Sequence, residues 1–372
     1  MCLARETNVN TEQLDEFSAR YLDVLNHGAL CLMISIGDRT GLFAVLRSTG
    51  PSTAVQLAAA SHLNERYVRE WLGAMVAGKI VKINDDQFAL SEPAAQLFAS
   101  EDKASNIAYL SQYIGMLGEV ETHVVDCFYK GGGVPYSAFS RFHEVMAEDS
   151  GQNIVAALLD HILPLVPGLT TALENGINVL DIGCGRGRAL HLLAEKFPKS
   201  RFTGCDLSDE AIAYARDHAN RSKPHNLRFE VRDLTTFDRE ASEAAYDVVT
   251  AFDAIHDQAR PDNVLAGIHR SLKPEGVFLM QDIRASSSIA KNRDHPLGPL
   301  LYTISCMHCM TVSLAQGGMG LGAMWGEQKT LEFLKSAGFA NVEVRTLEHD
   351  IQNNYYVARK HPQSRGQVER AD

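Results

Sequence analysis

The chain has 372 residues, of which 45% are hydrophobic and 22% charged, a composition typical of a globular protein of about two domains. Its formal net charge of −11 and pI near 5.7 argue against a nucleic-acid partner or an anionic membrane surface. Seven scattered cysteines, an odd number, fit reduced thiols in a cytoplasmic protein, and residues 1–7 lack the apolar core of a signal peptide.

The first predicted helix begins at Thr11, and apolar residues recur along it at helical spacing. The apolar pattern continues through residues 29–46, where its longest unbroken run is too short for a membrane span. Such a stripe indicates core packing or a dimer face, and we expect a homodimer. Tyr21, which belongs to the stripe, is alternatively a residue that reaches the binding site of a partner subunit.

Residues 51–90 have the pattern of two short helices followed by two strands around an Asp85-Asp86 turn. The pattern resembles a winged helix-turn-helix, so DNA binding is one interpretation. This segment carries as many acidic as basic residues, which suits phosphate binding poorly. We therefore favour a role in dimerisation and in covering a substrate.

Residues 91–131 are predicted to form a helical connector that ends in a Gly-rich joint at residues 131–133. We expect the domain boundary there, because such joints carry few contacts across them. A further helix is predicted to open behind the joint, and Phe142 and Met146 lie on it at helical spacing.

The most informative stretch is Asn178 to Ala189, which reads as a strand, a glycine-rich turn and the start of a helix. Gly183, Gly185 and Gly187 allow a tight turn and let a ligand approach bare backbone. The following helix directs its amide groups at that ligand. The third glycine comes one place too early for a dinucleotide fingerprint.

Four further signals follow in order: a strand ending at Asp206, a strand followed by Asp233, a strand ending at Phe252, and a Lys-Pro-x-Gly turn before a fifth strand. Together with the glycine turn they resemble the class I methyltransferases that use S-adenosylmethionine. The resemblance covers about residues 176–282. It implies an α/β fold with a Rossmann-like sheet, preceded by the mostly helical winged-helix-like domain.

The resemblance also implies cofactor contacts. Asp181 would lie near the methionine ammonium group, Asp206 would accept the ribose hydroxyls, and Asp233 would accept the adenine amino group. The full set of expected contacts to S-adenosyl-L-methionine is Asp181, Gly183, Gly185, Gly187, Asp206, Leu207, Asp233, Leu234 and Phe252.

The catalytic residues are expected directly after the fourth strand, where His256 and Asp257 follow at the carboxyl end of the sheet. The Ile-His-Asp motif resembles that of plant-type O-methyltransferases, and the resemblance implies that His256 is the general base. A structural histidine is the alternative. Gln258 replaces the tryptophan usual in that motif, so the acceptor pocket is expected to differ from a phenol site.

An insertion at residues 283–326 is where related enzymes build the acceptor pocket. The expected substrate contacts are Tyr21, Phe142, Met146, His295, His308 and Trp325. Cys306 and Cys309 form a single Cys-x-x-Cys pair, which lacks the four ligands of a structural zinc site, so no metal is expected. The glycine run at residues 317–322 is interpreted as a lid or a close-packed turn.

The predicted domains are 1–130, a dimerisation and substrate-covering domain; 131–175, a helical linker; 176–360, the S-adenosylmethionine-binding domain; and 361–372, a flexible tail. The predicted function is methyl transfer to the oxygen or sulfur of a small molecule, with small thiols such as hydrogen sulfide or methanethiol as candidate acceptors. The alternatives are a winged-helix regulator that uses the methyltransferase fold as a ligand sensor, and a catalytically silent partner subunit.

Overall fold

A computed structural model describes residues 10–100, 106–222 and 224–360. The expected tail at 361–372 lies outside these residues. The chain divides into two compact units, Met1–Gly115 and Met116–Asp372. The sequence placed the boundary near residue 130, but the Gly-rich joint there is packed. A Cβ on Gly133 would lie 1.9 Å from the carbonyl oxygen of Thr311, and the N–H of Val134 donates to Thr311 Oγ1 at 2.8 Å.

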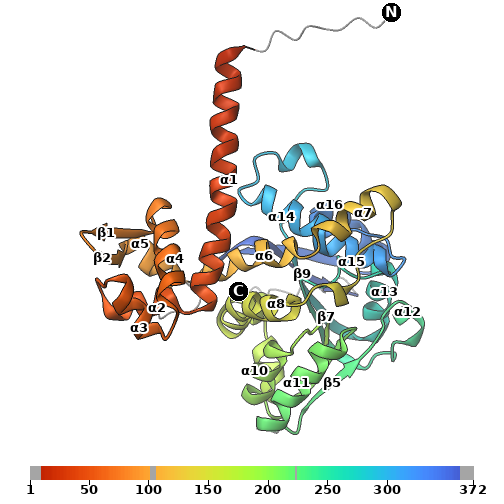
Figure 1. Ribbon diagram of the computed structural model, residues 1–372. Coiled ribbons are helices and arrows are strands. Elements are labelled where there is room, and N and C mark those ends of the chain that lie inside the picture. The colour runs from red at the N-terminus through yellow and green to blue at the C-terminus, as the bar shows by residue number, and fades with distance from the viewer. Residues whose placement is uncertain (1–9, 101–105, 223, 361–372) are drawn as a thin grey trace, which may run out of the picture. The chain divides into compact units, whose positions relative to one another are not determined.

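The first unit is a winged helix-turn-helix preceded by a long helix (Figure 1). Its elements are α1 (Thr11–Arg39), α2 (Leu42–Thr49), α3 (Ala54–Ser61), α4 (Glu65–Ala77), β1 (Val81–Asn84), β2 (Gln87–Leu90), α5 (Glu92–Phe98) and η2 (Ala108–Ser111). Strands β1 and β2 pair antiparallel as the wing. The apolar core is centred on Phe43, Trp71 and Leu72. Thr53 begins α3 with a capping box that it shares with Gln56.

Helix α1 is long but only lightly packed. Of its 29 residues, only Ile34, Ser35 and Gly37 are buried. The helical pattern was expected to run on to residue 46, but Gly41 adopts a left-handed conformation (φ +71°) and separates α1 from α2. No single described helix is long and apolar enough to cross a membrane; α1 and α2 pass that test only as a pair bent by 69°.

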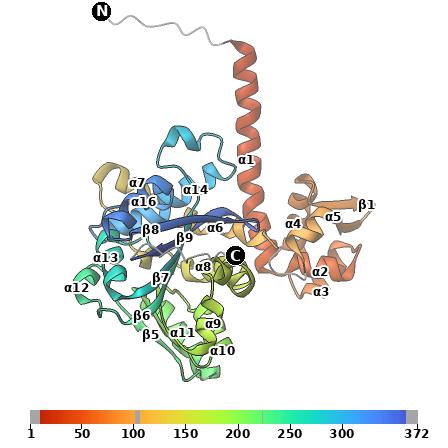
Figure 2. The same cartoon turned by 180° about the vertical axis from the view of Figure 1, so that it is seen from behind.

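The second unit is built on a seven-stranded sheet in the order β5-β4-β3-β6-β7-β9-β8 (Figure 2). The strands are β3 (Asn178–Ile182), β4 (Arg201–Asp206), β5 (Leu227–Val231), β6 (Tyr246–Phe252), β7 (Leu272–Ile283), β8 (Asn341–Leu347) and β9 (Asp350–Arg359). Strands β3 to β7 run parallel, and β9 is antiparallel to both of its neighbours. This confirms the predicted Rossmann-like fold.

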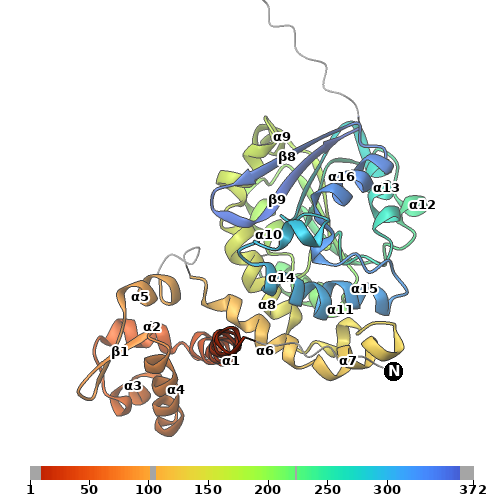
Figure 3. The same ribbon diagram turned by 90° about the horizontal axis from the view of Figure 1, so that it is seen from above.

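Helices cover both faces of this sheet because adjacent residues on the buried strands are both apolar. Val179, for example, packs with the helices of one face and Leu180 with those of the other. Figure 3 shows α9 (Leu169–Asn175) and α10 (Arg188–Lys196) on one side, and α12 (Phe237–Glu240), α13 (Pro261–Ser271) and α16 (Gly326–Ser336) on the other.

The main other helices of the second unit lie before the sheet, between β4 and β5, or in the insertion after β7. They are α7 (Glu121–Lys130), α8 (Phe142–Ser150), α11 (Asp209–Ser222), α14 (Gly298–Ile304), the π-turn η8 (Ser305–Cys309) and α15 (Met310–Ala315). Helix α6 (Gln112–Gly118) spans the division between the units.

Candidate functional site

The strand order reverses between β3 and β6, and a cavity of about 530 Å³ lies beyond their carboxyl ends. Crevices at such switch points are the usual ligand sites of open α/β sheets. Its wall is made by the β3–α10 turn, the ends of β4 and β6, and helix α8. This volume is within the range of small-molecule pockets.

The β3–α10 turn requires its glycines for two different reasons. All three adopt left-handed backbone angles, with φ of +68° at Gly183, +51° at Gly185 and +69° at Gly187. A side chain on Gly183 would also collide with Ala254 Cβ, at 2.4 Å, and one on Gly187 would collide with Phe229. Gly185 has no atom within 4 Å of that position, so its side-chain space is open. The backbone is therefore exposed to a ligand where α10 begins.

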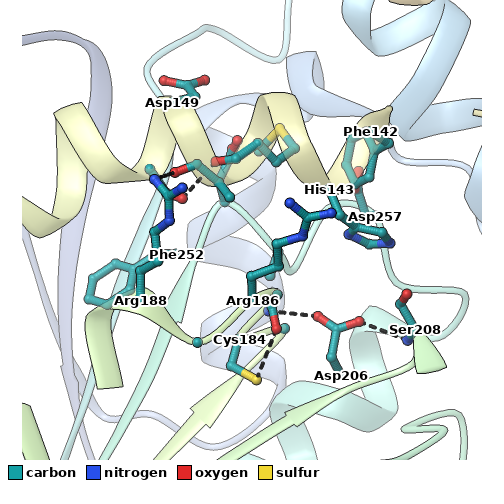
Figure 4. A pocket seen from close by; sticks show the side chains of 18 of the residues that line it. Phe142, His143, Asp149, Cys184, Arg186, Arg188, Asp206, Ser208, Phe252 and Asp257 are labelled. Carbon is teal, nitrogen blue, oxygen red and sulfur yellow. Dashed lines mark hydrogen bonds between the residues drawn. The ribbon is translucent and has the colours of Figure 1, made fainter. Parts of the chain in front are cut away.

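Two carboxylates stand beside this turn. Asp206 lies at the end of β4, where its Oδ2 accepts from the N–H of Gly185 at 2.9 Å and its Oδ1 accepts from the N–H of Ser208 at 2.9 Å (Figure 4). Asp181 is buried on β3, and its Oδ1 accepts from Thr250 Oγ1 at 2.6 Å. Burial raises the pKa of Asp181 to about 7, although the hydrogen bond from Thr250 acts in the opposite direction.

Most of the expected cofactor contacts line the cavity. Asp181, Asp206 and the three glycines do so, as do Leu207, Leu234 and Phe252. Asp233 does not. It is exposed, and its Oδ1 accepts from the N–H of Thr235 at 2.9 Å, the bond of a local turn.

Helix α8 closes another side of the cavity. It brings Phe142 and Met146, both expected from the sequence, together with His143 and Asp149, which were not expected. Tyr136 also lines this wall. Figure 4 shows Phe142, His143 and Asp257 gathered on one side of the cavity.

His256 does not line the cavity, whereas its neighbour Asp257 does. The ring of His256 is 1% exposed. Its Nδ1 lies 2.9 Å from Asp282 Oδ1, and its Nε2 lies 3.2 Å from Asp257 Oδ1. His256 was expected to face the acceptor; in the structure it lies behind the cavity wall, with a carboxylate near each of its nitrogens.

The pKa values of His256 and Asp257 follow from their surroundings. Burial by itself lowers the pKa of His256, but the carboxylates of Asp282 and Asp257 raise it well above the usual value. Burial opposes ionisation of Asp257, yet His256 holds the pKa of that carboxyl below its usual value. Asp257 thus faces the cavity as an ionised carboxylate. Tyr136 donates its hydroxyl to Asp257 Oδ2 at 3.3 Å.

Four of the residues that were expected to contact the substrate do not line the cavity. His308 is 1% exposed and stacks on Phe142 with ring centroids 3.8 Å apart, behind the wall. Trp325 is buried and donates from Nε1 to Asp282 Oδ1 at 3.1 Å. His295 bonds backbone through both nitrogens, to Arg284 and Leu297. Tyr21 lies on α1 in the first unit and is 56% exposed.

Comparison with known families gives a match in each unit. Residues 173–338 match the family described as "Methyltransferase domain", and residues 28–99 match the "Rv2258c-like winged HTH domain". The chain joins a winged helix-turn-helix domain to a methyltransferase domain.

Relatives of this chain match it over only part of its length. A fatty-acid O-methyltransferase of Mycolicibacterium smegmatis is 31% identical over 109 residues, which cover 29% of this chain and 38% of that protein. A ubiquinone biosynthesis O-methyltransferase of Sodalis glossinidius is 35% identical over 121 residues, covering 32% of this chain and 44% of that protein. The chain thus spans less than half the length of these relatives.

Solved structures match over both domains. Human N-acetylserotonin methyltransferase in complex with SAM has a TM-score of 0.65 at 17% identity and covers 96% of this chain and 99% of its own. The mitomycin 7-O-methyltransferase MmcR has a TM-score of 0.64 at 19% identity, with coverages of 94% and 100%. At sequence identities this low, the structural similarity shows the fold alone.

The glycine run of the methyltransferase domain is a close-packed turn. The N–H of Gly318 donates to the carbonyl of Ser313 at 2.9 Å, and the N–H of Gly320 donates to Ser313 Oγ at 3.1 Å. A Cβ on Gly318 would lie 2.5 Å from Ala259 Cα. Of the two interpretations of this run, the structure supports the turn.

Proposed function

We propose that the protein is an S-adenosylmethionine-dependent methyltransferase that acts on the oxygen or sulfur of a small molecule. The observation that carries this proposal is the glycine turn with Asp206 beside a cavity at the switch point of a methyltransferase domain. Among the similar structures, that of the human enzyme contains SAM and that of PigF contains SAH.

The residues present suit this cofactor. Asp206 lies where an acidic residue accepts both ribose hydroxyls, and it is already oriented by two backbone N–H groups. Asp181 lines the cavity, where the positive charge of the cofactor's ammonium group would favour its ionised form, and Leu234 supplies an apolar surface for the adenine ring. When bound, the cofactor supplies an electrophilic methyl group on a sulfonium.

On the acceptor side, Asp257 rather than His256 takes the direct role. Asp257 faces the cavity and is ionised, so it can accept a proton from a hydroxyl or thiol. His256 is a positioning residue that holds this carboxylate through Nε2. Phe142 and Met146 provide the apolar surface that orients the acceptor. A thiol acceptor needs least help, because it is partly ionised near neutral pH.

The regulator alternative gains no support from the winged helix-turn-helix. Its second helix, α4, carries Arg66 and Arg69, and each is paired within the helix, with Glu70 and Glu65 respectively. A helix whose basic groups are already neutralised offers little for phosphate.

We further propose that α1 is a homodimer contact. Its exposed large apolar residues include a set at spacings of three, four and seven, which lie on one face of a helix: Leu14, Phe17, Tyr21, Leu25, Leu32 and Ile36. An apolar stripe of this length on a helix with three buried residues needs a partner surface, and a second copy of the stripe supplies one. Sedimentation should show a dimer that Leu25→Glu converts to monomer and that the exposed polar change Gln13→Glu leaves intact. A monomeric wild type would overturn this proposal.

The test of the function is formation of S-adenosylhomocysteine with pooled thiols, phenols, aliphatic alcohols, carboxylic acids and amines. Turnover is expected with a thiol or hydroxyl pool. Asp206→Asn should weaken S-adenosylmethionine binding by about 10- to 100-fold, the value of one to two charge-assisted hydrogen bonds. Asp257→Asn should lower turnover and leave cofactor affinity unchanged. Tight cofactor binding without turnover in any pool would favour the sensor interpretation.

A further inference from the structure

Behind the acceptor wall lies a buried group of metal-ligating side chains that the methyl-transfer proposal does not explain. His256 and Asp257 follow β6, and Cys309 comes from η8 in the insertion. One ligand atom from each residue lies within 4.8 Å of the others, and all three residues are buried. Asp257 also faces the cavity, so this group borders the space where the acceptor would lie.

The orientation of His256 suits metal binding. Asp282 Oδ1 lies 2.9 Å from Nδ1 of the ring and also accepts from Trp325 Nε1 at 3.1 Å and from the N–H of Ile283 at 2.8 Å. This carboxylate accepts the Nδ1 proton, which leaves Nε2 directed at Asp257. A carboxylate on the far nitrogen is the usual support of a histidine ligand.

Carboxyl groups outnumber cationic groups around His256. Asp253, Asp257 and Asp282 surround it, and within the described part of the chain the ion pairs of these three carboxylates are all with histidines. Asp257 Oδ1 is buried and lies 3.2 Å from His256 Nε2, but it accepts no well-formed hydrogen bond among the described residues. Buried negative charge in excess is costly, and a cation would relieve it.

We propose that His256 Nε2, Asp257 Oδ1 and Cys309 Sγ bind a divalent transition metal, for which zinc suits the nitrogen, oxygen and sulfur donors best. Zinc at tetrahedral geometry places nitrogen and sulfur ligands roughly 3.5 Å apart, within the span of this group. Three protein ligands leave a fourth position open, as in catalytic zinc sites. Cys309 is the member of the Cys-x-x-Cys pair that reaches the group; Cys306 packs among apolar residues of another cluster.

This inference deepens the proposed function and rests on it for its chemistry. With zinc bound, Asp257 would hold the ion and would no longer be free to accept a proton from the acceptor. The ion would instead lower the pKa of a thiol or alcohol at its open position, and that proton would pass to solvent. The carbon–sulfur bond of the sulfonium breaks with its electron pair remaining on sulfur. The new bond forms between that methyl carbon and the acceptor heteroatom, and S-adenosylhomocysteine and the methylated product result.

The first experiment measures metal in the full-length protein. Chelator-treated protein is dialysed against zinc and then against metal-free buffer, and bound zinc is counted by mass spectrometry. One zinc per chain is expected. Replacing zinc by cobalt(II) should give a near-ultraviolet sulfur-to-cobalt charge-transfer band, which shows that a thiolate is a ligand.

Cys309→Ser should remove the cobalt band and weaken zinc binding by more than about 100-fold, since even supporting residues of metal sites contribute 10- to 100-fold. Cys306→Ser is the matched control and should keep both the cobalt band and the zinc affinity of the wild type. Asp257→Asn provides a second variant if Cys309→Ser fails to fold. Absence of retained zinc in wild type, or equal zinc affinity in wild type and Cys309→Ser, overturns the inference.

The outcomes for the metal and for the proposed function are separate. Turnover without retained metal would leave the methyltransferase proposal standing and remove the zinc site. Stoichiometric zinc with a cobalt–thiolate band, but no turnover with any pool, would establish the site and overturn the proposed function. Loss of turnover on chelation, restored by zinc, is the result expected if both hold.

Discussion

Gly183→Ala is the change that tests most directly how the cofactor turn is built. Two costs combine at this residue. An alanine at φ +68° costs about 1–2 kcal/mol in backbone energy. Its Cβ would also lie 2.4 Å from Ala254 Cβ, an overpacking that costs about 1–3 kcal/mol. The free energy of unfolding of the second unit should therefore fall by about 2–5 kcal/mol.

Gly185→Ala is the matched control, because it shares the left-handed backbone but has no atom within 4 Å of the new Cβ. It should cost only about 1–2 kcal/mol. Ala254→Gly removes the atom that the new Cβ meets. Combined with Gly183→Ala it should recover about 1–3 kcal/mol, a coupling energy between adjacent residues.

The assay is urea unfolding followed by tryptophan fluorescence. The chain has two tryptophans, one in each unit, so a Trp71→Phe background makes Trp325 the reporter of the second unit. Equal losses in Gly183→Ala and Gly185→Ala, or no recovery with Ala254→Gly, would refute the steric argument.

Three other predictions concern single groups. The pKa of Asp181 is raised from 3.8 to about 7 by burial, so the folded chain holds a proton that the unfolded chain releases. Its contribution to stability is therefore present below about pH 4 and is lost as the pH rises to about 7. Asp181→Asn should remove this part of the pH dependence of the free energy of unfolding. An unchanged pH dependence in the variant contradicts the assignment. Thr53→Ala removes the capping box of α3 and should cost the first unit about 1 kcal/mol, measured through Trp71 fluorescence, whereas a neutral result would show that the cap contributes nothing. Within the same unit, the Cβ added by Gly73→Ala in α4 meets no neighbour, and this variant should be more stable by about 0.5–1 kcal/mol. The Cβ added by Gly37→Ala in α1 would lie 2.7 Å from the rings of Phe43 and Trp71, and this variant should be less stable. Equal melting temperatures of the two variants would contradict both predictions.

Features that are determined by residues close together along the chain could be predicted from the sequence. Residues 51–90 were predicted to form two helices followed by two strands, and the structure has them as α3, α4, β1 and β2. The glycine turn and Asp206 were found because backbone angles and strand ends leave a signature within a few residues.

Side-chain direction in loops was decided by residues far along the chain. The sequence places His256 and Asp257 together after β6, but Asp282 and Trp325 determine that the histidine turns inward and the carboxylate faces the cavity. Likewise, only the packing of the insertion separates Cys309, which reaches His256, from Cys306, which does not. Local pattern fixes the backbone because its hydrogen bonds are short in range, whereas a buried polar side chain takes the direction in which distant partners satisfy its charge and hydrogen bonds.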